Sequence, residues 1–513
     1  MNEQAVKEFL GNMPRNELRT FLADMNIDVK RGIGSRTDAY KFGGHWFMLP
    51  DNTEYLNSYF CSRPGAKYSF TKWEGLQGIL KKYMCGQQVY EDELDELATL
   101  SENFLGDKCY FNRKGFEKML KKHNGRIPVS IQSVKEGSRI PIGHVMMQVI
   151  NTDPEFPWIV NYIETLLMHC WYASVIATKT ALLTDFIGQA VEKSCDADPE
   201  TRAFLKRVMF HCFGYRSATS EETAGVGGLA ILSNTLGTDT MAAIWQGIDY
   251  YNADPTGKGI ALSVAATEHS IQTAEYGEYG PDEGDRRYLR RMLRDNPFGI
   301  LSLVGDGNSI EKFVGLMKEP EFVDLIIKRA AQDNGKLNRV VVRPDSPRFE
   351  NDTPIAQVEW IADELYNTYG GGTNSYDLRT LNSAVGVIYG DGLSEFEIID
   401  LYTGLMKRYD VTSFIVGQGG GAMQKANRDD QRSKIACSAQ YRNGKWWDVY
   451  KDPLDKSKAS LPGRLALIIN DDGEYETIRE EALGDRENLL IEVFRDGEML
   501  VEWSLDDLRA DWK

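Results

Sequence analysis

The stretch Asn338–Ser346, NRVVVRPDS, decides the fold. Its first part, RVVVR, is a β-branched run, which is typical of a strand buried on both faces. The run ends in Arg343, Pro344 and Asp345, so a cation and a carboxylate stand at the carboxyl end of the predicted strand. Ligands bind at that end in parallel α/β folds. Arg343 is suited to hold an oxyanion with two hydrogen bonds, and Asp345 to bind sugar hydroxyls or hydrated Mg²⁺. A purely structural role explains the same residues, with Asp345 as a capping residue that pairs with a nearby Arg.

Six further short apolar runs end in Gly, Asp or Arg, and each precedes a helical segment. They are HCFGYRS (211–217), LGTDT (236–240), IALSVAATEHS (260–270), GILSLVGDG (299–307), SAVGVIYGDG (383–392) and SFIVGQGGG (413–421). Seven strand-and-helix units in about 220 residues favour a barrel over an open sheet. We therefore predict an α/β protein whose main domain is an irregular (β/α) barrel.

The rest of the chain is expected to form a second, α+β domain. Short turn-bounded runs after residue 430, such as WWDVYKD and LLIEVFRDG, indicate antiparallel strands. We assign residues 1–36 to an N-terminal helical extension, 37–199 with 425–513 to the α+β domain, and 200–424 to the barrel. The apolar segment FPWIVNYIETLLMHCWYASVIAT is expected to be a helix running into a strand. Because it contains Glu164, His169 and Lys179, we do not expect it to span a membrane.

Composition excludes several classes of function. The net charge of −17 repels nucleic acids and anionic membranes, so we expect neither as a partner. Seven scattered cysteines form no CxxC pair, which argues against zinc sites and a disulfide framework. The N-terminus has no apolar stretch of the kind found in signal peptides. We therefore expect a cytoplasmic protein.

The segment FIVGQGGGAMQKANRD, residues 414–429, predicts a phosphate site. Glycines allow backbone N–H groups to approach a phosphate closely, and late barrel strands commonly bind phosphate in this way. Lys425 and Arg428 follow on the expected helix. The spacing is not GxGxxG, which disfavours dinucleotide binding. A flexible glycine turn is the simpler alternative.

Several polar residues end the other predicted strands. Asp306 and Asp391 lie in GDG turns, and together with Asp345 they suggest a metal-bound phosphorylated sugar. His269 could act as a base, a phosphate donor or a phosphate acceptor, although a lone His is more often structural. Asp239 could accept hydrogen bonds from an amide. Phe213 and Arg216 offer an aromatic face and a cation, although such an aromatic is usually a core residue.

Together these segments resemble the nicotinamide phosphoribosyltransferases, a type II phosphoribosyltransferase family. The resemblance runs in order from about Asp38 to near the C-terminus. It rests on DAYK, SYFCSR, GLQGILKKY, NTDPEFPWIVNYIET, FGYRSATSEETAGVGG, GTDT, AATEHS, RPDS, GDG, GQGGGAMQKANRD and YKDP. GYRS…SEETAG and the GQGGG…QK…RD run are specific, whereas GDG alone is not.

The resemblance implies transfer of phosphoribosyl from phosphoribosyl pyrophosphate to nicotinamide, with Mg²⁺, giving nicotinamide mononucleotide and pyrophosphate for NAD salvage. It implies a homodimer with shared active sites, and stimulation by ATP through phosphorylation of His269. The implied roles are pyridine stacking by Phe213 and the partner subunit's Tyr40, amide binding by Asp239, phosphoryl binding by Arg216 and Arg343, ribose or metal binding by Asp306 and Asp345, ribose binding by Gly390 and Asp391, and phosphate binding by Gly419, Gly420, Lys451, the partner subunit's Arg63 and the partner subunit's Arg428.

Two departures from the family pattern stand out. Residues 1–36 extend beyond the family's usual start, and Ala436 stands where the family carries a basic residue, for which Lys434 is a possible substitute. A nicotinate phosphoribosyltransferase is the nearest alternative. The Asp239 carboxylate would repel nicotinate but accept a hydrogen bond from nicotinamide, so we prefer the amide. A non-catalytic binding protein with this fold should have lost the polar residues at the strand ends, but all of those named above are present. A barrel aldolase would need a Schiff-base lysine at a strand end, and none of the strand ends named above carries one.

Overall fold

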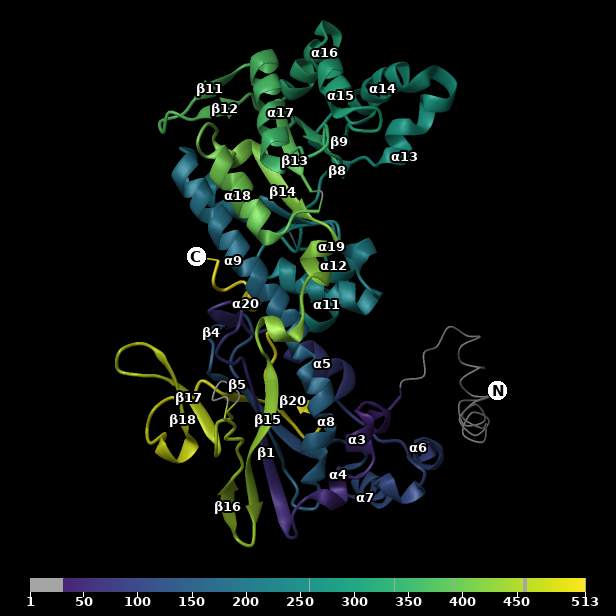
Figure 1. Ribbon diagram of the computed structural model, residues 1–513, viewed down its shortest axis with the longest axis vertical. Coiled ribbons are helices and arrows are strands. Elements are labelled where there is room, and N and C mark those ends of the chain that lie inside the picture. Colours follow the sequence, from purple (N-terminus) through teal and green to yellow (C-terminus); the bar gives the residue numbers. More distant parts are fainter. Residues whose placement is uncertain (1–30, 258, 336, 391, 455–458, 513) are drawn as a thin grey trace. The chain divides into compact units, whose positions relative to one another are not determined.

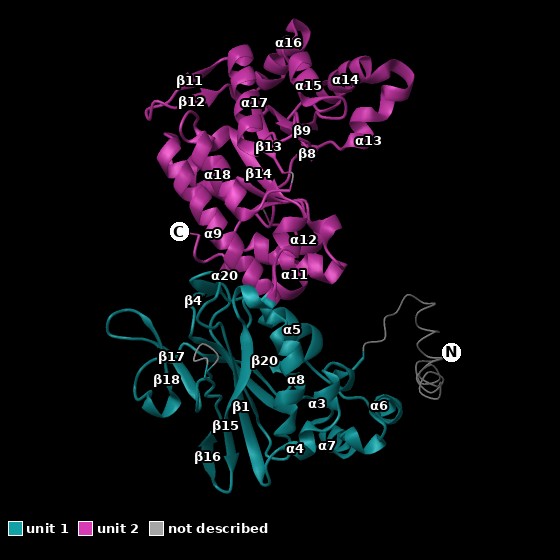
Figure 2. Ribbon diagram, in the orientation of Figure 1, with its two compact units in different colours: residues 1–171, 428–503 teal, residues 172–427, 504–513 magenta. Residues whose placement is uncertain are grey.

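The computed structural model describes residues 31–257, 259–335, 337–390, 392–454 and 459–512 (Figure 1). The chain divides into two compact units (Figure 2). Unit 1 contains residues 1–171 and 428–503, and unit 2 contains residues 172–427 and 504–513. The boundary thus falls at residue 171 rather than the expected 199, and the last ten residues join unit 2. Most of the expected helical extension, up to residue 30, lies outside the described residues.

Unit 2 is built around a curled parallel sheet of seven strands in the order β7-β6-β14-β13-β10-β9-β8. The strands are β6 (Phe210–Cys212), β7 (Gly237–Thr238), β8 (Ala265–Ala266), β9 (Ile300–Val304), β10 (Arg339–Arg343), β13 (Val385–Tyr389) and β14 (Phe414–Gln418). Leu262, just before β8, bridges to Gly237 of β7 in parallel, which joins the two edges of the sheet. All seven predicted strands are present, and the expected irregular barrel is confirmed.

The central strand β10 shows why the valine run forms sheet. It pairs in parallel with β9 on one side and β13 on the other. Val340, Val341 and Val342 are all almost completely buried. Burying a valine side chain stabilises the fold by roughly 1.5–3 kcal/mol. The strand ends at Arg343, where the chain leaves the core.

Helices follow most strands of unit 2. They are α10 (Pro199–Val208), α11 (Glu221–Leu232), α12 (Met241–Tyr251), α13 (His269–Gln272), α14 (Tyr276–Asp295), α15 (Ile310–Met317), α16 (Pro320–Ala330), α17 (Pro354–Tyr369), α18 (Glu395–Leu405), α19 (Gly420–Gln424) and α20 (Leu505–Leu508). A small hairpin, β11 (Gly371–Thr373) with β12 (Arg379–Leu381), follows α17. Helix α14 has a break at Gly280, whose φ of 76° is readily adopted by glycine.

The expected strand after residue 170 is wrong. The segment forms two helices, α8 (Trp158–Met168) and α9 (Cys170–Ser194). By length and composition Trp158–Ser194 could cross a membrane, but 72% of its most apolar window is buried within the protein. Side chains of α8 lie in the core of unit 1, and those of α9 lie in the core of unit 2. Residues 172–199 therefore belong with the barrel rather than with the α+β domain.

Unit 1 contains an antiparallel sheet of seven strands, in the order β16-β15-β1-β5-β3-β19-β20. They are β1 (Thr53–Cys61), β3 (Val129–Ser133), β5 (Val145–Asn151), β15 (Lys434–Arg442), β16 (Lys445–Asp448), β19 (Ile491–Arg495) and β20 (Glu498–Met499). Two hairpin-like pairs add β2 (Phe70–Lys72) with β4 (Arg139–Pro141), and β17 (Leu465–Ile469) with β18 (Tyr475–Arg479). The expected antiparallel character of the region after residue 430 is confirmed.

Helices of unit 1 come from its N-terminal part. They are α3 (Ala39–Phe42), α4 (His45–Met48), α5 (Leu76–Tyr83), α6 (Glu91–Leu105), α7 (Arg113–His123) and α8. Strand β15, from the C-terminal part, pairs along the length of β1. The N- and C-terminal parts of the chain thus share one sheet, as expected for the α+β domain.

Candidate active site

Candidate residues follow the strands of the parallel sheet at their carboxyl ends. Phe213 follows β6, Asp239 follows β7, His269 begins α13 after β8, Asp306 follows β9, Arg343 and Asp345 end β10, Gly390 follows β13, and Gly419 and Gly420 follow β14. Parallel strands bring their carboxyl ends to one edge of a sheet. We call these residues the carboxyl edge. Asp391, which was expected among them, lies outside the described residues.

His269 lies between two carboxylates. Its Nε2 is 2.8 Å from Oδ1 of Asp306, and its Nδ1 is 3.9 Å from Oδ2 of Asp345. Ser346 Oγ donates a hydrogen bond to the other oxygen of Asp306. The Asp306 side chain is buried, whereas that of His269 is 46% exposed. An imidazole oriented by a buried carboxylate but open to solvent is suited to react with an incoming group.

The guanidinium of Arg343 has hydrogen-bond donors that are only partly satisfied within the described residues. Its Nη2 donates to the backbone oxygen of Thr267 at 2.8 Å. Its Nε is buried and has no hydrogen-bond partner among the described residues. Arginine can present two parallel donors to one phosphoryl group. The site therefore has a cation whose donors are not all satisfied by the chain itself.

Asp239 is held by two neighbours that the sequence did not point to. Its Oδ1 accepts hydrogen bonds from Nε2 of His211 at 3.0 Å and from Oγ of Ser263. Burial acts to raise the pKa of Asp239, but these hydrogen bonds, with the charge of Arg343, bring it below its usual value. The carboxyl group is thus ionised at neutral pH. Both bonds go to Oδ1, which leaves Oδ2 available to a ligand N–H donor.

An aromatic wall adjoins this carboxylate. The ring of Phe213 stacks on His211, with centroids 4.8 Å apart and an interplanar angle of 30°. A Cβ on Gly417 would lie only 2.2 Å from Cε2 of Phe213, so the ring lies directly against the backbone of β14. A Cβ on Gly390 would also approach the same atom, at 3.3 Å. The Phe213 ring is therefore fixed between the His211 imidazole and the glycine backbone.

The glycine-rich turn after β14 is anchored from α9. Lys179 is buried, and its Nζ donates to the backbone oxygen of Gly421 at 2.7 Å. Gly420 lies against Ser217, because a Cβ added to Gly420 would approach Ser217 Cβ at 3.2 Å. Arg216, beside Ser217 in a short 3₁₀ helix, is exposed. The predicted phosphate turn is therefore close to the segment that carries Arg216.

Unit 1 carries the remaining predicted residues on its own surface. Tyr40 in α3 is 60% exposed, and Arg428 is 55% exposed. Arg63 Nε donates to the backbone oxygen of Arg432 at 2.9 Å. Burial lowers the pKa of Lys434, and the nearby charges of Arg63 and Lys451 lower it further. We call Arg63, Lys434 and Lys451 the basic cluster of unit 1.

Four contributing residues were missed by sequence reasoning: His211, Ser263, Ser346 and Lys179. His211 carried a detectable signal, because residues two apart along an extended segment point to the same side, and His211 precedes Phe213 by two. Lys179 gave no such signal, since it lies in a buried helix that was interpreted in part as a strand. Within the described residues, no group of three or more His, Cys, Asp and Glu side chains is arranged to hold a metal ion by itself.

Comparison with known proteins identifies the family of the chain. Residues 208–498 match the nicotinate phosphoribosyltransferase (NAPRTase) family, and residues 33–131 match the nicotinamide phosphoribosyltransferase N-terminal domain. The chain is 32% identical to a nicotinamide phosphoribosyltransferase of Xanthomonas campestris, over 92% of this chain and 96% of the other. It is 26% identical to a nicotinamide phosphoribosyltransferase of Acinetobacter baylyi, over 92% and 95%.

Among solved structures, the fold is similar to that of a nicotinate-nucleotide pyrophosphorylase from Pyrococcus furiosus. The TM-score is 0.50 at 15% identity, over 99% of this chain and 95% of the other. This likeness concerns the fold alone. The family matches cover the barrel and the α+β unit, and the sequence identity extends through both. The chain is therefore a phosphoribosyltransferase that belongs to the nicotinate and nicotinamide phosphoribosyltransferase family.

Proposed function

We propose that this enzyme transfers the phosphoribosyl group of phosphoribosyl pyrophosphate to the ring nitrogen of nicotinamide. The C1′–oxygen bond to pyrophosphate breaks as the C1′–nitrogen bond forms, which gives nicotinamide mononucleotide and pyrophosphate for NAD salvage. The observation that carries the proposal is the ionised Asp239 next to the Phe213 wall, with Oδ2 left open. This pairing fits a flat pyridine ring that bears a carboxamide.

Asp239 favours nicotinamide over nicotinate on electrostatic grounds. The carboxamide of nicotinamide offers an N–H donor to the open oxygen of Asp239. Nicotinate would place a second negative charge against it, in a partly buried position where charges are less screened. Because His211 and Ser263 already lower the pKa of Asp239, the enzyme would not readily neutralise that repulsion by protonating Asp239.

The other residues of the carboxyl edge act on the sugar and its phosphoryl groups. The ring nitrogen of nicotinamide is already a nucleophile, so no general base is required. Breaking the bond to pyrophosphate builds positive charge at C1′ and negative charge on the leaving group. Arg343 and Arg216 are suited to stabilise that leaving group, and each such contact is worth about 3–4 kcal/mol of barrier. Gly390 and Asp391 would face the ribose, and Gly419 and Gly420 would hold the 5′-phosphate.

Mg²⁺ fits this site as an ion held mainly by the substrate. Mg²⁺ usually keeps several waters and binds through one or two carboxylates together with substrate phosphates. Asp345 is half exposed near His269 and matches that requirement, although no complete protein-only cluster exists among the described residues. When bound, Mg²⁺ would neutralise charge on the pyrophosphate.

His269 is suited to accept a phosphoryl group from ATP. If Nε2–H donates to Asp306, Nδ1 carries a lone pair on the exposed imidazole, with the Asp345 carboxylate 3.9 Å away. We propose that ATP phosphorylates this nitrogen, releasing ADP, and that later hydrolysis of the phosphohistidine releases phosphate. Asp306 positions the ring for this step. ATP would then stimulate synthesis without being required for it.

We further propose a cytoplasmic homodimer in which each site is completed by the other chain. The partner subunit's Tyr40 would cover the second face of the pyridine ring. The partner subunit's Arg63 and the partner subunit's Arg428 would reach the 5′-phosphate, together with Lys451. Lys434 lies in the basic cluster of unit 1, two residues before Ala436, so we assign to it the basic role that Ala436 cannot fill.

The experiment is product analysis with labelled nicotinamide or labelled nicotinate, phosphoribosyl pyrophosphate and Mg²⁺, with and without ATP. We expect nicotinamide mononucleotide and pyrophosphate in equal amounts, and a kcat/KM for nicotinamide far above that for nicotinate. A preference for nicotinate would overturn the assignment of Asp239 and favour the nicotinate phosphoribosyltransferase alternative.

A further inference from the structure

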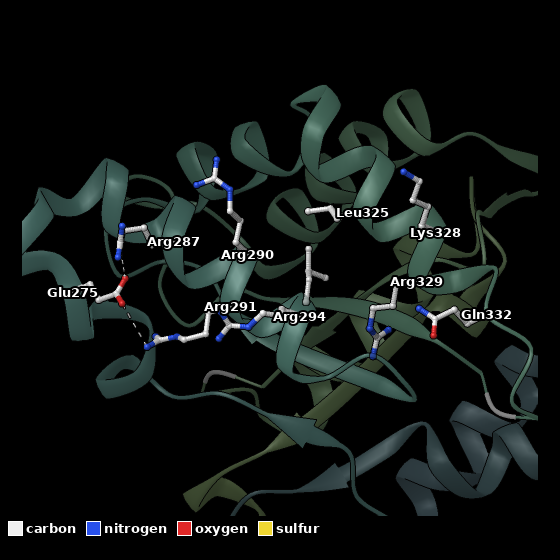
Figure 3. A pocket seen from close by; sticks show the side chains of 10 residues that line it. Glu275, Arg287, Arg290, Arg291, Arg294, Leu325, Lys328, Arg329 and Gln332 are labelled. Carbon is white, nitrogen blue, oxygen red and sulfur yellow. Dashed lines mark hydrogen bonds and ion pairs between the residues drawn. The ribbon is translucent and has the colours of Figure 1, made fainter.

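A basic cavity of about 680 Å³ lies in unit 2, between α14 and α16 (Figure 3). Six of the ten side chains that line it are cationic: Arg287, Arg290, Arg291, Arg294, Lys328 and Arg329. Glu275 is the one acidic residue among the ten. The chain as a whole has a net charge of −17, so this concentration of positive charge runs against the overall balance. None of the carboxyl-edge residues lines the cavity.

Most of these cations pair with carboxylates at exposed positions. Arg290 donates to both oxygens of Glu321, and Lys328 Nζ lies 2.6 Å from Asp324. Arg287 and Arg291 both turn toward Glu275, at 3.1 and 3.8 Å, so two guanidinium groups share one carboxylate (Figure 3). Arg294 pairs with the adjacent Asp295, and its side chain is 73% exposed. Exposed ion pairs contribute about 0–1 kcal/mol. An anionic ligand can therefore replace these carboxylates at little cost.

Arg329 is the observation that points to a ligand. It is only 3% exposed, its Nε donates to the backbone oxygen of Asn296 at 2.8 Å, and its Nη2 donates to that of Gly299 at 2.7 Å. Its Nη1 is buried and has no hydrogen-bond partner, and no carboxylate pairs with it among the described residues. Burial lowers the pKa of Arg329, yet a guanidinium stays charged at neutral pH. A buried charge without a counter-ion is costly, so an anion in the cavity would stabilise it.

The size and lining of the cavity narrow the ligand class. Binding sites for small molecules commonly have volumes of about 300–1,000 Å³. Guanidinium groups bind phosphoryl oxygens through two parallel hydrogen bonds. Arg329, together with the arginines whose exposed carboxylate partners can be exchanged, would balance several negative charges, more than one carboxylate or one phosphate carries. Leu293 and Leu325 also line the cavity and give it an apolar surface next to the charges.

We propose that this cavity binds a small molecule with a chain of linked phosphoryl groups, separately from the reaction site. An inorganic oligophosphate and a nucleoside triphosphate share this chemistry, and the two leucines favour the latter. The cavity is in contact with the segment that begins at His269, because Arg291 Nη2 donates to the backbone oxygen of Ile271 in α13 at 3.1 Å. A ligand there would compete for Arg291 and so act on the helix that carries His269.

The test is calorimetric titration of the full chain with inorganic tripolyphosphate and, separately, with ATP at physiological ionic strength. Both probes also suit the reaction site, so the site count is compared among variants. The wild type should show two sites per chain. Arg290→Gln with Arg294→Gln should weaken one of them at least tenfold. Arg286→Gln is the matched control, because Arg286 is on the same helix and, like Arg290, pairs with a glutamate, but it does not line the cavity.

Two further variants and a comparison of the two ligands separate the remaining outcomes. Arg329→Gln should abolish binding at the second site if this variant folds. If it does not fold, the double variant Arg290→Gln with Arg294→Gln remains the test, because both of its residues are exposed. Arg343→Met should lose synthesis and keep the second site, so failure of the proposed reaction and failure of this site are distinguishable. Tighter binding of ATP than of tripolyphosphate supports a nucleotide site, and equal binding supports an oligophosphate site. One site in all variants, or a second site unaffected by the double substitution, would overturn the proposal.

Discussion

In unit 2, Asp239, His269 and Arg343 each have a close polar partner within the same unit. In unit 1, Tyr40 and Arg428 are mostly exposed, and Arg428 makes a long pair with the exposed Asp429 at 3.8 Å. The first three end or follow strands of the parallel sheet, where the backbone is fixed by parallel pairing. The other two lie on a four-residue helix and a 3₁₀ turn. Residues that orient chemistry need fixed positions. Residues that close a site over its substrate can gain their partners only when the site is assembled.

The largest effect should come from the carboxyl edge. Arg343→Met removes the partly unsatisfied guanidinium, and we expect kcat/KM to fall by roughly 10²–10³, the loss typical of one donor to developing negative charge. Steady-state synthesis of nicotinamide mononucleotide measures it. Arg343→Lys is the matched control. It keeps the charge but not the paired donors, so its activity should be intermediate. Wild-type rates in a folded Arg343→Met chain would remove Arg343 from the mechanism.

The next effect concerns the choice between nicotinamide and nicotinate as the substrate. Asp239→Asn keeps the shape of the side chain but removes its charge, so we expect the preference for nicotinamide over nicotinate to fall by about 10–100-fold. The ratio of the two kcat/KM values measures it. Ser263→Ala, which removes one hydrogen bond to Asp239, should shift the ratio much less. An unchanged ratio in Asp239→Asn would mean that another residue selects nicotinamide over nicotinate.

A smaller effect is expected from the phosphate-accepting imidazole. His269→Ala should abolish stimulation by ATP and leave basal synthesis measurable, because the pyridine nitrogen needs no base. Rates with and without ATP, and ADP release, are the measurements. Asp306→Asn should weaken the stimulation without removing it, since Asp306 only orients the ring. Equal stimulation of wild type and His269→Ala by ATP would show that His269 is not the carrier.

The smallest effect tests how rigid the loop after β10 is. Arg348 donates to both oxygens of Asp352, at 2.7 and 2.8 Å, and these bonds lower the pKa of Asp352. Asp352→Asn should reduce the free energy of unfolding by about 1.5–3 kcal/mol at pH 7. A lowered pKa stabilises the folded chain above the unfolded pKa of about 3.9, and that contribution is lost as the pH falls through the folded pKa.

Thermal unfolding at pH 7 and at successively lower pH measures this difference. The gap between wild type and Asp352→Asn should be widest above pH 4 and should close below it. Asp282→Asn breaks an exposed pair with Lys312 and serves as the control, with an expected change of about 0–1 kcal/mol. A gap that widens in acid would have the wrong sign for this ion pair.

The sequence predicted the barrel better than its surroundings. Each barrel strand is a short apolar run that ends in a polar residue, and these two features together identify both the strand and its carboxyl end. Helix α9 was misassigned because Val175 and Ile176 lie in a helix buried on most sides. Such a helix lacks an exposed polar face, so its periodicity resembles that of a buried strand.

Site residues were predictable where they followed a strand directly. Ser263 was missed because it precedes β8 and reaches Asp239 only through tertiary structure. The arginines between α14 and α16 were not noted, since arginines spaced along a helix usually indicate only a solvated face. What distinguishes them is the burial of Arg329, which no pattern in the sequence reveals.

The contrast between the two units can be tested by mixing inactive chains. One chain would carry Asp239→Ala, in unit 2, and the other Tyr40→Ala with Arg428→Ala, in unit 1. If each site combines unit 2 of one chain with unit 1 of a second, mixed dimers contain one intact site and synthesis should return to roughly a quarter of the wild-type rate. A mixture as inactive as its components, after subunit exchange is verified, would contradict the shared site.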